Sequence, residues 1–258
     1  MVKIKPRHVH LICNAKYHDT DFARSELINL FSEHDDLGVS ISQDYSDFYK
    51  FNDSDLLITY TCDLSPEQEE VDTLREFLNN GGKWFGLHGT NALIEFVGEM
   101  QIVDGLEIPG KTDTPNKNPE LMKLLGSRFI AHPPNMTIKV KVNDKSHPIT
   151  KDLEDFEIFD EPYYCEFSDG IKILLESRYT DDADAYVSSS WKEDIPRPQM
   201  YLHKVGKGSV LYLMLGHCRG KYDMRPFMDE CPVDRGGWES EVFYELLRRG
   251  IKWGINKL

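Results

Sequence analysis

The sequence predicts one α/β domain over residues 1–258, built on a mostly parallel, doubly wound sheet with β-rich insertions. Two observations lead to this prediction. Short apolar runs in the first third of the chain alternate with segments in which apolar residues recur at helical spacing, which is typical of parallel strands joined by crossover helices. The later apolar runs are mostly strand-like and predict the insertions. The early runs are His8–Cys13, Val39–Ile41, Asp55–Tyr60 and Lys83–Leu87.

The helical segments between these runs carry start and stop signals. A stripe of apolar residues after the first run predicts a helix with Thr20 or Asp21 as its N-cap. Ser65 is the predicted N-cap of a later helix with proline at its first position, and an Asn-Gly-Gly sequence at residues 80–82 ends that helix. A further helix is predicted over Asn91–Val97.

The second half of the chain is richer in strand patterns. Gly, Pro, Asn and Asp accumulate from Gly98 to Pro134, which predicts a long insertion near the site, with a short helix over Pro119–Leu125. The chain ends in an amphipathic helix that includes Val242 and Ile251. The strands predicted between these helices are Met136–Val142, Ile171–Glu176, Tyr186–Trp191 and a hairpin of Gln199–Lys204 with Ser209–Leu215.

Composition and charge exclude several classes of protein. The 30 basic and 44 acidic residues leave a formal charge of -14, which repels nucleic acid and anionic lipid, so neither partner is expected. The 5 cysteines are scattered without a Cys-x-x-Cys pair, which predicts reduced thiols. The N-terminal residues lack a signal-peptide core, and no run approaches the roughly 20 apolar residues of a membrane helix. We therefore expect a cytoplasmic protein.

Three histidines directly follow predicted strands. They are His18, His88 and His217. Because ligands of doubly wound sheets bind at the carboxyl ends of the strands, we expect these imidazoles to reach one pocket. His88 lies in Gly-Leu-His-Gly, whose small neighbours resemble the tight Gly-x-Ser-x-Gly elbow, and an imidazole there could act as a base or a metal ligand. The alternative for His88 is a histidine held by backbone hydrogen bonds.

Other polar residues are weaker candidates. Asp19 next to His18 could bind a metal or a sugar hydroxyl, or cap the following helix, or both. The carboxylate pair Asp160-Glu161 precedes two tyrosines, a combination that suits sugar recognition. His132 lies in an irregular segment that periodicity does not place. The sequence contains no Walker loop or Gly-x-Gly-x-x-Gly motif, so no nucleotide cofactor is expected.

Several short motifs follow one another along nearly the whole chain. They are Tyr17-His18-Asp19, Gly86-Leu87-His88-Gly89, Arg128-Phe129, His132-Pro133, His147-Pro148-Ile149-Thr150, Asp160-Glu161-Pro162-Tyr163, Leu215-Gly216-His217 and Gly250-Ile251-Lys252-Trp253. In this set and order the chain resembles the trehalose-utilisation (ThuA-like) family.

The resemblance implies the fold of the class I glutamine amidotransferases, which is a flavodoxin-like three-layer core with loops that close over a carbohydrate-type ligand. It also implies a role in sugar catabolism beside oxidoreductases that make keto-sugars. The chain departs from the amidotransferases at the elbow, where His88 stands in place of the nucleophilic cysteine. Glutaminase chemistry by a thiolate at that position is therefore excluded. No sequence feature supplies Cys62 with a base that would make it a displaced nucleophile.

The leading hypothesis is a metal-assisted enzyme that isomerises, dehydrates, hydrates or hydrolyses a sugar or keto-sugar. We predict His18, His132 and His217 as ligands of a divalent metal, with zinc first and manganese or iron as alternatives. His88 and Glu161 are the predicted catalytic groups, with His88 acting as a base or as a further ligand. The predicted substrate-binding residues are Tyr17, Asp19, Asp160, Tyr163 and Arg128.

Two alternatives stay open. The first is a non-enzymatic amidotransferase-like module that binds a ligand, and the second is a metal-free acid/base enzyme that uses His88 with Glu161. Metal analysis followed by assays with and without a chelator separates these readings. The expected partner is a small carbohydrate, with a sugar oxidoreductase acting nearby, and the oligomeric state is left open.

Overall fold

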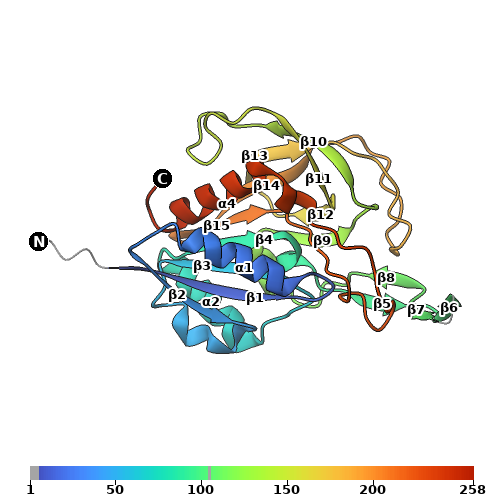
Figure 1. The fold of residues 1–258 in the computed structure, drawn as a ribbon. Helices are drawn as coiled ribbons and strands as arrows, with labels where there is room; N and C mark the ends of the chain where they lie inside the picture. Colours follow the sequence, from blue (N-terminus) through green and yellow to red (C-terminus); the bar gives the residue numbers. More distant parts are fainter. Residues whose placement is uncertain (1–5, 104–105) are drawn as a thin grey trace, which may run out of the picture.

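A nine-stranded sheet forms the centre of the molecule (Figure 1). The structure is a computed structural model that describes residues 6–103 and 106–258. In spatial order the strands are β11 (Phe156–Asp160), β10 (Met136–Val142), β13 (Lys172–Ser177), β14 (Arg197–Val205), β15 (Gly208–Leu213), β4 (Lys83–Leu87), β3 (Leu56–Cys62), β1 (Arg7–Ala15) and β2 (Leu37–Ser42).

The first four strands along the chain are parallel, as the sequence predicts. Strand β1 lies between β2 and β3, and β3 pairs with β4, all in parallel register. Every residue of β3 is buried, which explains why this strand has no polar alternation. The prediction that the runs beginning at His8, Asp55 and Lys83 are adjacent parallel strands is therefore confirmed.

The other half of the sheet is antiparallel, so the prediction of a mostly parallel sheet is wrong. Strand β15 is parallel to β4, but β14, β13, β10 and β11 follow it with antiparallel pairings. The reason is the connection between strands: the short turn at Val205–Gly208 joins β14 to β15, and a tight hairpin can only join antiparallel strands. Apart from Tyr186–Trp191, the strands predicted in this half extend the sheet that the parallel strands begin.

Helices cover both faces of the parallel strands. Adjacent residues of β4 show this, because side chains alternate between the faces of a sheet. Phe85 lies against Gly250, whereas the Cα of Gly86 faces Tyr212 and Leu125. Two of the helices, α1 and α4, pack against each other, as do the other two. The helices are α1 (Thr20–Phe31), α2 (Gln68–Asn79), α3 (Pro119–Leu125) and α4 (Glu241–Gly254).

Two helices begin at other residues than the predicted caps. Asp19 is the N-cap of α1, and its carboxylate accepts from the Phe22 N–H at 3.1 Å. Glu67, rather than Ser65, is the N-cap of α2. The Glu70 carboxylate accepts the Glu67 N–H at 2.7 Å and completes a capping box, which satisfies donors that the serine two residues earlier does not reach.

The segments after β4 differ most from the predictions. A 3₁₀ turn over His88–Asn91 follows β4, and β5 (Glu95–Val97) pairs with β8 (Lys111–Asp113) where a helix over Asn91–Val97 was predicted. The strand expected at Tyr186–Trp191 is also wrong, because this segment forms turns and only a single bridge joins Thr112 to Tyr186. Apolar residues occur in both segments, but pairing partners far along the chain decide their conformation.

Short strands and 3₁₀ turns make up the remaining structure. Strand β9 (Ser127–Ala131) pairs with β12 (Tyr164–Phe167), and the Asp160-Glu161-Pro162-Tyr163 motif joins β11 to β12. An arm of paired strands extends from the carboxyl ends of β1, β3 and β4 (Figure 1). The arm contains β5 and β8 and, beyond them, β6 (Gln101–Val103) and β7 (Leu106–Ile108). Two further 3₁₀ turns are η1 (Tyr45–Lys50) and η3 (Gly236–Glu239). None of the helices that the structure describes combines the length and apolar character needed to cross a bilayer.

Candidate functional site

His88 stands at a strained elbow directly after β4. Its φ of 46° lies in the left-handed region, which a non-glycine residue adopts only when its surroundings hold it there. A Cβ on Gly89 would lie 2.9 Å from both the Thr61 carbonyl oxygen and the Cys62 Cβ, so only glycine fits next to His88. The Tyr212 hydroxyl donates to the His88 carbonyl at 2.7 Å and fixes the turn. The predicted elbow is thus present, although a 3₁₀ turn follows it.

The His88 ring is buried, although a tight elbow of this kind projects its central side chain beyond the end of the strand. The ring is only 1% exposed and stacks on Tyr163, with 4.7 Å between ring centroids. Replacement of His88 by alanine therefore creates a buried cavity as well as removing a functional group.

The rings of His18 and His88 approach each other with their Nε2 atoms. His18 Nδ1 lies 2.8 Å from the Lys16 carbonyl oxygen, and His88 Nδ1 lies 2.8 Å from the Met214 carbonyl oxygen. A carbonyl oxygen only accepts, so Nδ1 of each ring carries the proton that it donates. A neutral histidine with its proton on Nδ1 presents a lone pair at Nε2. The Nε2 atoms of His18 and His88 are 3.0 Å apart. Two lone pairs at this distance repel each other unless a positive charge or a proton lies between them.

Glu161 connects the remaining histidines to this pair. Its carboxylate is 4% exposed and lies 3.3 Å from His88 Nε2, 3.2 Å from His132 Nε2 and 3.4 Å from His217 Nδ1. Neither ring nitrogen of His217 has a hydrogen-bond partner among the described residues, although the ring is fully buried. His18, His88, Glu161 and His217 each offer one ligand atom, and these atoms lie within 4.8 Å of one another. We call these four residues the His–Glu cluster.

Glu161, His18, His132 and His217 all have shifted pKa values. Burial alone raises the pKa of the Glu161 carboxyl, but His132 and His217 outweigh burial and hold that pKa well below its usual value. Burial, with His88 and His217, lowers the pKa of His18 well below the ordinary value, and burial also lowers the pKa of His132. For His217 the contacts with Glu161 outweigh burial and raise the pKa. A carboxylate anion surrounded by imidazoles is a typical environment for a divalent cation.

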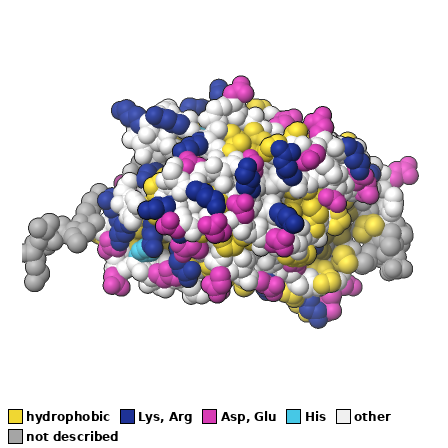
Figure 2. Space-filling view, turned by 90° about the horizontal axis from the view of Figure 1, so that it is seen from above, with side chains coloured by type: hydrophobic (Ala, Val, Ile, Leu, Met, Phe, Trp, Pro, Cys, Tyr) yellow, Lys and Arg dark blue, Asp and Glu magenta, His cyan; other side chains and the backbone are white. Residues whose placement is uncertain are grey.

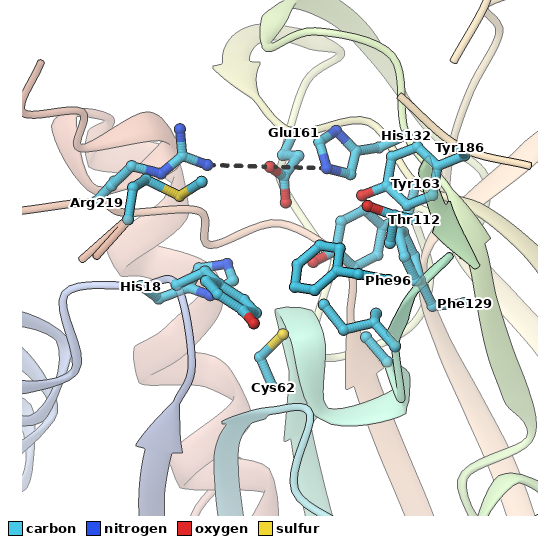
Figure 3. Close-up of a pocket in the computed structure, with 14 residues that line it drawn as sticks. His18, Cys62, Phe96, Thr112, Phe129, His132, Glu161, Tyr163, Tyr186 and Arg219 are labelled. Atoms are coloured by element: carbon cyan, nitrogen blue, oxygen red, sulfur yellow. Dashed lines mark ion pairs between the residues drawn. The ribbon is translucent and has the colours of Figure 1, made fainter. Parts of the chain in front are cut away.

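The cluster lies at one end of an aromatic cavity of about 130 Å³ (Figure 3). His18, His132 and Glu161 open into this cavity, and Tyr163 places its hydroxyl 3.0 Å from His88 Nε2. Aromatic side chains from five separate segments form its walls: Tyr17, Phe96, Phe129, Tyr163 and Tyr186.

Arg128 and Asp19, two of the predicted substrate-binding residues, lie outside the cavity lining. Arg128 forms an ion pair with Glu166, at 2.9 Å, and donates to the Thr114 carbonyl. Asp19 caps α1 and pairs with Arg235 at 3.0 Å, which agrees with the capping alternative. The structure gives neither residue the position expected of a substrate ligand.

Asp160 has a positioning role instead of a place in the cavity. Its fully buried carboxylate accepts backbone N–H groups of Glu161, Gly216, His217 and Gly237 at 2.7 to 3.1 Å. Burial raises the pKa of this carboxyl, and the N–H donors and nearby histidines offset part of the rise. Asp160 therefore joins the segments that carry Glu161 and His217, the members of the cluster farthest from the elbow in sequence.

Sequence reasoning missed several residues of the cavity. Phe96, Thr112, Phe129, Tyr186 and Arg219 line it, and they belong to the insertion after β4 or to loops without periodicity. Phe129 and Arg219 had a local signal, since Phe129 stands in the Arg128-Phe129 motif and Arg219 follows His217 by two residues. Cys62 also lines the cavity, but burial raises the pKa of its thiol, so this cysteine stays protonated at neutral pH.

Fold and site together define a mixed α/β protein with a buried histidine and carboxylate cluster under an aromatic pocket. The model of the family described as trehalose utilisation (ThuA) matches residues 109–231. The resemblance expected from the sequence is therefore confirmed. None of the curated proteins compared with the chain matches it.

Solved structures share the fold over most of the chain. A putative ThuA-like protein from Parabacteroides merdae ATCC 43184 has a TM-score of 0.68 at 18% identity, covering 97% of this chain and 90% of its own. A putative ThuA-like protein from Bacteroides uniformis ATCC 8492 has a TM-score of 0.67 at 19% identity, covering 100% and 94%. A β-galactosidase from Rahnella sp. R3 shares the fold over 32% of its length, with a TM-score of 0.54 at 12% identity and 99% of this chain covered.

Proposed function

We propose that this chain is an enzyme of carbohydrate metabolism in which the His–Glu cluster holds a divalent metal, zinc foremost, beside a sugar or keto-sugar in the aromatic cavity. One observation carries the proposal. The Nε2 lone pairs of His18 and His88 face each other at 3.0 Å while both Nδ1 atoms are committed to carbonyl oxygens. This arrangement is stable when a cation accepts both lone pairs, and such backbone bonds to Nδ1 are the usual support of histidine ligands.

The spacing of the ligand atoms fits a tetrahedral ion. Bonds of about 2.0–2.1 Å from zinc to its ligands place neighbouring ligand atoms about 3.3 Å apart. Three separations in the cluster are near this value: 3.0 Å between the Nε2 atoms of His18 and His88, 3.3 Å from His88 Nε2 to Glu161 Oε2 and 3.4 Å from His217 Nδ1 to Glu161 Oε1. All four ligand atoms lie within 4.8 Å of one another. The otherwise unpartnered nitrogens of His217 supply a further reason for a bound ion. His88 and Glu161 thus join His18 and His217 in the proposed ligand set.

The residues of the cluster and of the cavity have different proposed roles. A metal at the cluster polarises a carbonyl or hydroxyl oxygen, which acidifies a neighbouring C–H or O–H group. His132 opens into the cavity with Nε2 3.2 Å from Glu161, and its lowered pKa leaves it neutral and able to accept a proton. The aromatic walls stack on the apolar faces of a sugar ring. The Tyr163 hydroxyl, next to His88 Nε2, orients the part of the sugar that lies beside His88. This set suits isomerisation, elimination or hydration.

Metal analysis of protein purified without a histidine tag tests the proposal. We expect close to one equivalent of a divalent metal, turnover of a keto-sugar panel that stops with a chelator, and recovery when the metal is restored. The His217→Ala variant should lose the metal, whereas the matched His147→Ala variant, altered far from the cluster, should keep it. Full turnover in metal-free protein would overturn the metal assignment in favour of acid/base chemistry by His88 with Glu161. Bound metal without turnover of any sugar would favour a ligand-binding module.

A further inference from the structure

Arg219 contributes a cationic group to the wall of the cavity. It follows the His217 segment, and its side chain points toward Glu161 (Figure 3). Two backbone hydrogen bonds join Arg219 to Asp234, at 2.7 and 2.9 Å, and fix the start of this side chain. Apart from the histidines, Arg219 and Glu161 are the charged residues that line the cavity in the described part of the chain.

The guanidinium of Arg219 is poorly partnered where it lies. The nearest carboxylate oxygen belongs to Glu161 and is 4.0 Å from Nη2, beyond hydrogen-bond distance. The Arg219 Nε is buried, and no residue in the described ranges accepts its N–H. Glu161 is already surrounded by three imidazoles, so it does not need Arg219 as a counter-ion. A buried donor without an acceptor is costly. The Arg219 side chain as a whole is 28% exposed, so its Nη groups are the donors that a ligand in the cavity can reach.

The surface outside the cavity carries charged side chains of both signs. Acidic and basic side chains are interspersed over the face shown in Figure 2, and the chain as a whole carries a formal charge of -14. A single arginine with free donors inside an aromatic cavity is therefore a local exception. A guanidinium offers parallel N–H groups whose geometry matches a carboxylate or a phosphate.

We propose that Arg219 binds an anionic group of the ligand, a carboxylate or a phosphate, so that the substrates of this site are acidic sugars. This inference rests on the proposed carbohydrate function and names the substrate class of the same cavity. The ring of the sugar lies against the aromatic walls, its reacting oxygen faces the His–Glu cluster, and its anionic group faces Arg219. Arg219 is a binding residue and takes no part in proton transfer.

Isothermal titration with three matched sugars tests the inference. The probes are D-glucose, D-glucuronate and D-glucose 6-phosphate at fixed ionic strength, titrated into the metal-loaded protein and into protein treated with a chelator. A charged hydrogen bond of about 1.5–3 kcal/mol corresponds to tighter binding of an acidic sugar by about 10- to 100-fold. The two acidic probes show whether the anion is a carboxylate or a phosphate.

Variants assign the preference to Arg219. R219Q should bind the three sugars with similar affinity, R219K should keep part of the preference, and the control R128Q, altered outside the cavity, should behave like the unaltered protein. R219K also keeps the test valid if R219Q does not fold. A preference that survives in R219Q, or no binding of either acidic probe, would overturn the inference. If the preference for acidic sugars disappears with the chelator but survives in R219Q, the anion binds the metal, and the inference about Arg219 is overturned. Turnover and metal content report the proposed function separately.

Discussion

Asp160→Asn is the sharpest test of how the site is assembled. Each carboxylate oxygen of Asp160 accepts two backbone N–H groups: Oδ1 those of Glu161 and His217, Oδ2 those of Gly216 and Gly237. Asparagine retains one acceptor oxygen and replaces the other by an NH₂ group. Whichever way the amide turns, two buried N–H donors then face another donor.

The size of the effect follows from these contacts. Hydrogen bonds to a charged group contribute about 1.5–3 kcal/mol each, so the loss of two is expected to cost about 3–6 kcal/mol. For a domain of this size, at about 2–4 °C per kcal/mol, that corresponds to a fall in Tm of about 6–24 °C. Urea denaturation followed by circular dichroism measures the change in the free energy of unfolding. The cluster should also lose metal, because Glu161 and His217 are no longer held together.

Asp155→Asn is the matched control. The exposed Asp155 carboxylate accepts a single backbone N–H, from Val142 at 2.9 Å, and the oxygen of asparagine can continue to accept it. We expect a change within about 0.5 kcal/mol, as for ordinary surface substitutions. If Asp160→Asn unfolds at the same urea concentration as the unaltered protein, the carboxylate does not organise the site and the reasoning is refuted.

Three further predictions address single residues. His88→Ala should reduce turnover by about 10²–10⁴-fold and lower Tm as well, because the ring is functional and buried; unchanged turnover would remove His88 from the mechanism. Cys62→Ala should leave turnover of the sugar and the metal content unchanged, because burial keeps the thiol protonated; loss of turnover with metal retained would revive the cysteine as a nucleophile. Burial, assisted by Lys50, lowers the pKa of His10 to about 4, from 6.5. The unfolded chain binds more protons between these values, so stability falls as pH falls from 6.5 to 4, by at most about 3 kcal/mol from this group. The non-titrating His10→Asn variant should lose less stability over that range in urea titrations, and an equal loss would contradict the assignment.

The local pattern of the sequence determined the parallel strands, the final helix and the hairpin. It also placed His18, His88 and His217 after strands, and the parallel arrangement then brought them to one edge of the sheet. These features depend on side-chain periodicity and on turn residues, which act over a few positions along the chain. The small neighbours of His88 likewise predicted its elbow, because the steric limits of such a turn are local.

The tertiary structure decided which polar groups belong to the cavity. Asp160 and Arg128 stand directly before Glu161 and Phe129, which line the cavity, but their own side chains do not. The Asp160 carboxylate accepts from the backbone of residues 216 and 217, and Arg128 pairs with Glu166. The contact between His18 and His88 joins residues 70 positions apart, and the bond that fixes the His88 ring comes from Met214, 126 positions away. The orientation of a side chain in a loop depends on partners that are close only in the folded chain, and periodicity contains no record of them.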